Sequence, residues 1–209
     1  MYKLYAKKII AFLLGTFIIQ IGCAFFLNSK AGADSISVFN EGVGHTFNIT
    51  TGNAFYILLG VSFVALLIFA REKINLGTFL GLLSAGIFLD IAQVAIDQLN
   101  IDALPLIVRL LIVFGSCFII ALGVAVQKSA NLGIAPHDEI PFLITELTKI
   151  EYRWVRMGLD FIFIIAGYLL GGVIGFGTII TLLAIGPCIQ FFLPKVEGPL
   201  NSFVNGTNE

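Results

Sequence analysis

The sequence predicts an all-α membrane protein with six transmembrane helices, arranged as two three-helix repeats of inverted topology. Composition is the first reason. Of the 209 residues, 58% are hydrophobic and 12% are charged, whereas a soluble domain has about 25% charged residues. A soluble chain of this length has too little interior to bury so much apolar surface. The other two reasons are the number of long apolar runs and an internal sequence similarity.

Apolar runs of about 17–25 residues are long enough to cross a bilayer as a helix. We expect spans at residues 9–27, 54–70, 76–96, 104–126, 155–173 and 174–193. The first run follows three lysines but is longer than the apolar core of a signal peptide, so we expect it to be retained. A glycine-rich turn, GGVIGFG, separates the last two spans.

Basic residues predict the orientation, because short cytoplasmic loops are rich in Lys and Arg. With the N-terminus inside, only Lys30 and Arg109 among the 12 basic residues lie on the outer side. We therefore expect a multi-pass protein of the bacterial cytoplasmic membrane with both termini in the cytoplasm. The net charge of −1 gives no indication of a nucleic-acid partner.

The two halves of the chain are similar to each other. A shift of 100 residues aligns LGTFLGLLSAGIFLD, from Leu76, with FGTIITLLAIGPCIQ, from Phe176. Because each half has an odd number of spans, the second half enters the membrane from the opposite side. We expect one repeat at residues 1–101, a second at 102–194 and a short, disordered cytoplasmic tail at 195–209. Four repeated glycines are expected to let helices approach closely: Gly77, Gly86, Gly177 and Gly186.

A short polar segment follows the first span of each half, in KAGADSISVFNEGVG and in NLGIAPHDEIPFLITE. Each contains good helix-starting residues and predicts a helix too short to cross the membrane. If the two helices dip into the protein from opposite faces, their N-termini point at a central site that binds a solute or an anion. The alternative is that both are amphipathic connectors on the membrane surface. The candidate binding residues are Gly32, Asp34, Ser35, Gly133, Pro136, His137 and Asp138.

Ionisable residues inside spans are costly and are therefore candidates for function. Asp90 and Arg109 are expected at similar depth, where they could form an ion pair, and Asp160 could be linked to proton movement or substrate. Arg156 precedes Asp160 by one helical turn, so these two can also pair. The alternative for both arginines is that they extend to the lipid headgroups.

GIAPHDEIPFLITELTKIEYRW and the run from Gly171 to Pro194 resemble the second half of the bacterial YczE/YyaS family of integral membrane proteins, which is related to YitT. GADSISVFNEG and INLGTFLGLLSAGIFLD resemble its first half, so the resemblance covers residues 8–194. The family usually has Gly-Pro-aromatic-Asp in that half, where this chain has Gly32, Ala33, Asp34 and Ser35. The resemblance implies the architecture, and it implies no particular substrate.

Three functions are compatible with these features. The first is a transporter of a small organic solute or anion through a site between the repeats. The second is a substrate-binding membrane subunit of an ATPase-driven importer, and the third is a non-transporting accessory or scaffold protein. The motifs G-x-S-x-G, H-E-x-x-H, Walker A and the dinucleotide fingerprint are absent, so we expect no enzyme, cofactor or metal. The expected partners are the lipid bilayer, a small solute and a second copy of the chain in a homodimer.

Overall fold

The computed structural model describes residues 2–32, 34–49 and 51–205, and the described residues are helical except for short connections. Short 3₁₀ helices precede α4, at Arg71–Lys73, and α5, at Ile101–Ala103. The α-helices are α1 (Tyr2–Ser29), α2 (Ser35–Phe47), α3 (Thr51–Phe69), α4 (Leu76–Asp97), α5 (Leu106–Ser129), α6 (Pro136–Thr148), α7 (Tyr152–Leu169) and α8 (Phe176–Asn205).

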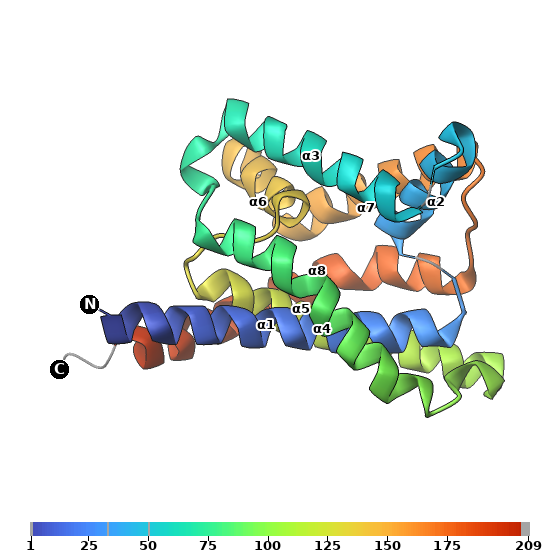
Figure 1. Cartoon of the computed structure of the whole chain (residues 1–209), viewed down its shortest axis with the longest axis horizontal. Coiled ribbons are helices and arrows are strands. Elements are labelled where there is room, and N and C mark those ends of the chain that lie inside the picture. Colours follow the sequence, from blue (N-terminus) through green and yellow to red (C-terminus); the bar gives the residue numbers. More distant parts are fainter. Residues whose placement is uncertain (1, 33, 50, 206–209) are drawn as a thin grey trace.

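The helices form two layers (Figure 1). The lower layer contains the long helices α1, α4, α5 and α8, in which α1 packs on α4 and α5, and α5 packs on α8. The upper layer contains α2, α3, α6 and α7. Contacts in that layer run from α2 to α3, from α3 to α6, from α6 to α7 and from α7 back to α2. The four shorter helices therefore form a ring on top of the long ones.

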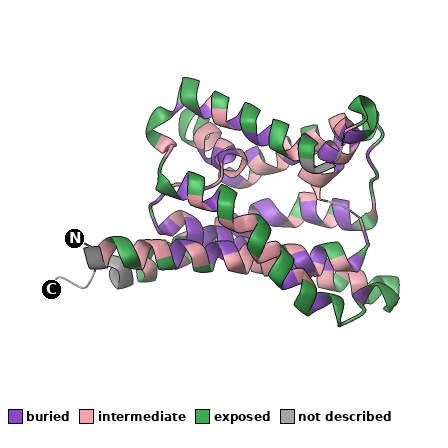
Figure 2. Ribbon diagram, viewed as in Figure 1, coloured by how far each residue is buried: buried purple, intermediate pink, exposed green. Residues whose placement is uncertain are grey.

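The structure confirms an all-helical membrane protein. Within the described residues, four helical segments are long and apolar enough to cross a membrane: Leu4–Ser29, Leu76–Asp97, Leu106–Ser129 and Phe176–Leu200. The runs expected at 54–70 and 155–173 correspond to α3 and α7. The apolar part of α3, Asn53–Phe69, is shorter, and α7 carries Arg153, Arg156 and Asp160. Exposed residues cover the outside of both layers in Figure 2, and many are large apolar side chains, as expected of a surface that faces lipid.

Glycines bring α1 and α5 into close contact. A Cβ added at Gly123 would lie 2.7 Å from the backbone nitrogen of Ile19, and one at Gly15 would lie 2.6 Å from that of Gln127. Lipid tails are as apolar as the side chains, so helices in a membrane associate mainly through such close packing. Beside this contact, the buried thiols of Cys117 and Cys188 belong to one apolar cluster.

The glycines at the starts of α4 and α8 also confirm their expected packing role. The N–H of Gly77 donates to the carbonyl of Leu132 at 2.6 Å, and the N–H of Gly177 donates to the carbonyl of Ala31 at 2.9 Å. A side chain at Gly186 would meet the backbone of Arg153 at 2.9 Å. The prediction is wrong for Gly86, because a Cβ there would have no neighbour within 4 Å.

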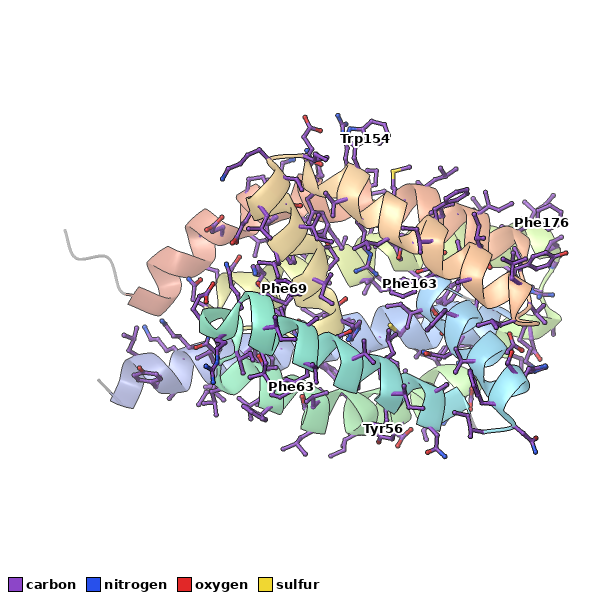
Figure 3. All side chains as sticks on the ribbon, turned by 90° about the horizontal axis from the view of Figure 1, so that it is seen from above. Tyr56, Phe63, Phe69, Trp154, Phe163 and Phe176 are labelled. Carbon is purple, nitrogen blue, oxygen red and sulfur yellow. The ribbon has the colours of Figure 1, made fainter. Side chains whose placement is uncertain are left out.

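The two short helices begin as the sequence predicts. The carboxylate of Asp34 caps α2 and accepts a hydrogen bond from the N–H of Ser37, while Pro136 occupies the first turn of α6. Each first turn contains a buried residue, with Ser35 5% and Glu139 1% exposed. In Figure 3, α2 and α6 fill the two ends of the space between α3 and α7. Their N-termini thus face the protein interior.

The expectation of a disordered tail at 195–209 is wrong for its first part. Helix α8 continues through Pro194 and Pro199 to Asn205, and residues 206–209 lie outside the described part. The extension is held by apolar contact, because Leu200 packs against the cluster formed by Ala11, Phe12, Ala130 and Leu132.

The α1–α5 contact predicts a position-specific effect on stability. Gly123→Ala places a methyl group against Ile19 and should destabilise the fold by about 1–3 kcal/mol, as overpacking usually does. Gly115→Ala on the same helix is the matched control, because a Cβ there has no neighbour within 4 Å. The midpoint of thermal unfolding in detergent should fall only for the first variant. Equal midpoints for the two variants would show that α1 and α5 do not approach closely at Gly123.

Candidate functional site

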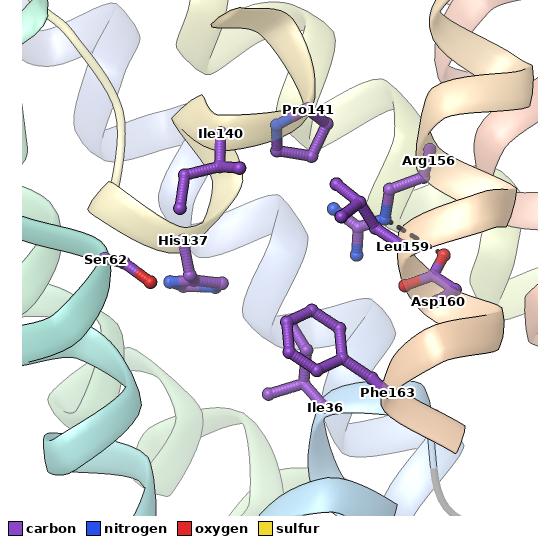
Figure 4. A pocket seen from close by; sticks show the side chains of 9 residues that line it. All are labelled: Ile36, Ser62, His137, Ile140, Pro141, Arg156, Leu159, Asp160 and Phe163. Carbon is purple, nitrogen blue, oxygen red and sulfur yellow. Dashed lines mark hydrogen bonds and ion pairs between the residues drawn. The ribbon is translucent and has the colours of Figure 1, made fainter. Parts of the chain in front are cut away.

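A small cavity lies at the centre of the ring formed by α2, α3, α6 and α7 (Figure 4). Its volume is about 30 Å³, which is room for one or two groups of the size of a water molecule. Each of the four helices contributes to its wall. The lining residues are Ile36, Ser62, His137, Ile140, Pro141, Arg156, Leu159, Asp160 and Phe163.

Arg156 is bonded to two carboxylates at this cavity. Its Nε donates to Oδ2 of Asp160 at 3.1 Å, and its Nη1 donates to Oδ1 of Asp138 at 3.2 Å. The side chains of Arg156 and Asp160 are only 12% and 4% exposed. Asp160 follows Arg156 by one turn of α7 and therefore lies on the same face, while Asp138 comes from the first turn of α6. The guanidinium joins α6 to α7.

Ser35 connects this cluster to the first half of the chain. Its hydroxyl donates to the second oxygen of Asp160, Oδ1, at 2.5 Å. Ser35 is the first residue of α2 and Asp138 lies in the first turn of α6. The N-terminal turns of both short helices therefore meet at the same charged residues of α7.

His137 lies between Asp138 and the cavity. Its Nε2 is 3.3 Å from Oδ2 of Asp138, and its ring makes an edge contact with Phe55 at a centroid distance of 5.6 Å. Its Nδ1 is buried and has no hydrogen-bond partner among the described residues. Burial raises the pKa of Asp138, but the attraction of His137 and Arg156 outweighs burial, and the pKa lies below its usual value. Asp138 is therefore charged at neutral pH.

Glu139 points away from this cavity, to a second and more open cleft. Both of its oxygens accept from Nζ of Lys128, at 2.6 and 2.9 Å, and burial nevertheless raises the pKa of Glu139. A second ion pair, between Lys73 and Glu146 at 2.7 Å, lies in the same cleft of about 260 Å³. The full lining is Lys73, Asn75, Lys128, Asn131, Gly133, Glu139 and Glu146.

The structure brings together four of the predicted site residues: Ser35, His137, Asp138 and Asp160. The other candidates on the short segments shape the connections and start the helices. Gly32 and Gly133 adopt positive φ of 140° and 84° in tight connections, while Asp34 and Pro136 start their helices. Of these, Gly133 also lines the second cleft.

The expected ion pair between Asp90 and Arg109 is absent. The guanidinium of Arg109 instead donates to the carbonyls of Ser29 and Lys30. Those carbonyls end α1, where the helix dipole is negative and attracts a cation. Asp90 is exposed on α4 and forms no ion pair within the described residues.

Two polar residues of the cavity, Arg156 and Ser62, are not among the site residues predicted from the sequence. The sequence predicts Arg156 only as a partner of Asp160 or as a headgroup contact, because its depth depends on how α6 covers α7. Ser62 is 3% exposed and lines the cavity from α3. The signal that could have found it is that it is the sole Ser or Thr in the run 54–70.

Comparison with known proteins places the chain in a family. Residues 6–194 match the family of unknown function DUF6198. The chain is 31% identical over 189 residues to the uncharacterized membrane protein YczE of Bacillus subtilis, covering 90% of this chain and 86% of the relative. It is also 25% identical to an uncharacterized protein of Haemophilus influenzae, over 90% of this chain and 84% of the relative. The B. subtilis protein YyaS is 25% identical, over 88% of this chain and 91% of its own length.

No solved structure matches the chain. The match to the family covers nearly the whole chain and agrees with the motifs that suggested the resemblance. The chain belongs to the DUF6198 family and is a membrane protein of the YczE/YyaS type.

Proposed function

We propose that this protein transports a small solute across the bacterial cytoplasmic membrane through the cavity between its two halves. The observation that carries the proposal is the cluster of Asp138, Arg156 and Asp160, which is joined to the first half by Ser35. Ionisable residues in the interior of a membrane protein are rare and often mark the path of a substrate or proton.

Burying these groups is costly even when they are paired. The desolvation of an ion costs several kcal/mol in proteins, and replacing a buried ion pair by apolar residues is often neutral or stabilising. Apolar side chains already form much of the cavity wall, including those of Ile140, Leu159 and Phe163. A binding role for the cluster accounts for charges that packing alone does not require.

The proposal includes two inverted repeats of three spans each, 1–101 and 102–194, with α3 and α7 as the middle spans. Helix contacts support it. If α1 to α4 correspond in order to α5 to α8, the contact of α1 with α4 corresponds to that of α5 with α8. In the same way, the contact of α2 with α7 corresponds to that of α6 with α3. Such reciprocal contacts are expected of a pseudo-two-fold axis.

Backbone details support the same correspondence. Non-glycine residues adopt positive φ after α1 at Lys30 (45°) and after α5 at Asn131 (52°). They do so again after α2 at Asn48 (53°) and after α6 at Lys149 (62°). Each pair is separated by 101 residues. Left-handed non-glycine residues are uncommon, so paired occurrences at one shift favour a duplicated unit.

Hydrogen bonds at the starts of the last helices agree with this. The hydroxyl of Thr78 accepts from the N–H of Asn75 at 3.3 Å, and that of Thr178 accepts from the N–H of Gly175 at 3.2 Å. With both termini in the cytoplasm, the C-terminal end of α2 lies on the outer side and that of α6 on the inner side. The distribution of Lys and Arg supports this orientation.

Chemical labelling tests the inverted topology. Phe47 and Thr148 are the last residues of α2 and α6, and both are exposed. In a variant lacking Cys23, Cys117 and Cys188, a membrane-impermeant maleimide should label Phe47→Cys in intact cells. It should label Thr148→Cys only in inside-out vesicles. Labelling of both positions from the same side would contradict the inverted repeats and leave the helical fold unaffected.

Uptake into proteoliposomes tests transport. We would screen radiolabelled methylammonium, glycine, acetate and phosphate, and expect at least one to accumulate above protein-free liposomes. Arg156→Gln should reduce that uptake to background, because two buried carboxylates lose their shared partner. Arg153→Gln is the matched control, since Arg153 lies on the same helix with a side chain that is 43% exposed, and it should retain wild-type uptake.

Breaking a buried pair costs about 3–5 kcal/mol, so the unfolding midpoint of each variant is measured as well. Ser35→Ala provides a milder change, because it removes one hydrogen bond to a charged group, worth about 1.5–3 kcal/mol. It should slow uptake and leave the fold intact. Absence of uptake for the whole panel, or normal uptake by a folded Arg156→Gln protein, would contradict the proposal. Uptake that requires a co-purifying ATPase would favour the importer-subunit alternative.

A further inference from the structure

We propose that the central cavity binds a small protonated amine, of the size of ammonium or methylammonium. This inference rests on the proposed function, because it names the chemical class of solute that the same site recognises. Three features of the cavity carry it: its charge, its free acceptor and its size.

The charge of the cluster is negative. Asp138 and Asp160 contribute two negative charges and Arg156 contributes one positive charge, so these three residues together carry a net charge of −1. Arg156 is occupied by both carboxylates, so it has little attraction left for an anion. The binding of one monovalent cation neutralises the cluster. The anion expected from the helix N-termini in the sequence is therefore disfavoured at this cavity.

The hydrogen-bonding groups of the cavity favour a donor. Nε2 of His137 is next to the carboxylate of Asp138, which can only accept, so the tautomer that fits this contact has its proton on Nε2. Nδ1 is then an acceptor, and it is buried with no partner among the described residues. The hydroxyl of Ser62 faces His137 across the cavity (Figure 4). An ammonium group supplies the N–H donor that Nδ1 of His137 lacks, whereas a quaternary ammonium ion does not.

Size and the remaining wall restrict the ligand further. A cavity of about 30 Å³ holds one or two groups the size of water, which fits ammonium or methylammonium and excludes large amines. The other walls are apolar, and the ring of Phe163 faces the cavity. An aromatic face attracts a cation when water is excluded, so this wall tolerates a positive ligand with a small methyl group.

The test is equilibrium binding of radiolabelled methylammonium to the purified full-length protein in detergent. We expect saturable binding that unlabelled ammonium displaces and that tetramethylammonium, sodium and acetate do not. Asp160→Asn should weaken binding roughly 10- to 100-fold, as expected for loss of a hydrogen-bonded charge. Asp90→Asn is the matched control, because Asp90 is an exposed aspartate on α4 without an ion pair in the described structure, and it should bind as the wild type does.

A second variant guards against misfolding of Asp160→Asn. His137→Leu removes the free acceptor and leaves both carboxylates paired with Arg156, and it should also weaken binding. Absence of saturable methylammonium binding, or an equal loss in Asp90→Asn, would overturn the inference. The inference would also be overturned if the unfolding midpoint of the wild type depended on pH while the protein bound no methylammonium.

Binding and transport fail separately. Methylammonium binding in detergent without uptake of any solute into liposomes would contradict the proposed transport and support this inference. Uptake of glycine, acetate or phosphate by a protein that binds no methylammonium would support the proposed transport and contradict this inference.

Discussion

The arrangement of the upper layer depends on one constraint, which is that the buried Asp160 and the half-buried Arg156 and Asp138 must satisfy one another. An unpaired buried charge costs several kcal/mol. Arg156 can reach both carboxylates only if α6 lies against α7 with its first turn at the level of Arg156. The hydrogen bond from Ser35 to Asp160 in turn requires the first turn of α2 to lie beside Asp160. The relative positions of α2, α6 and α7 thus depend on contacts with Arg156 and Asp160.

The lower layer follows a different rule. Its helices carry few charges, and besides the contact of Arg109 with the end of α1, small residues determine where they meet. Gly15 and Gly123 allow the backbones of α1 and α5 to touch. Gly77 joins the start of α4 to the connection that leads into α6, and Gly177 joins the start of α8 to the connection that leads into α2. The long helices position the connections, and the connections in turn direct α2 and α6 toward the cavity.

The proposed repeats are similar in backbone and different in chemistry. At a shift of 101 residues, Arg156 corresponds to Phe55 and Asp160 corresponds to Leu59. His137 and Asp138 correspond to Ile36 and Ser37. The charged groups therefore come from the second half, and the first half supplies Ser35, Ser62 and apolar wall. The ion pairs Lys73–Glu146 and Lys128–Glu139 lie in the second cleft, apart from this cavity.

The sequence by itself determined the helical membrane class, the location of each apolar run, the start of α2 at Asp34 and the start of α6 at Pro136. These features depend on composition, spacing and capping, which act between residues close in the chain. Only the tertiary structure decided which charges pair between helices. Arg109 binds the end of α1 instead of Asp90, and Arg156 bridges residues of two helices instead of reaching the headgroups. Side-chain pairing between helices depends on their rotation and relative depth, and a difference of one residue turns a helical side chain by about 100°.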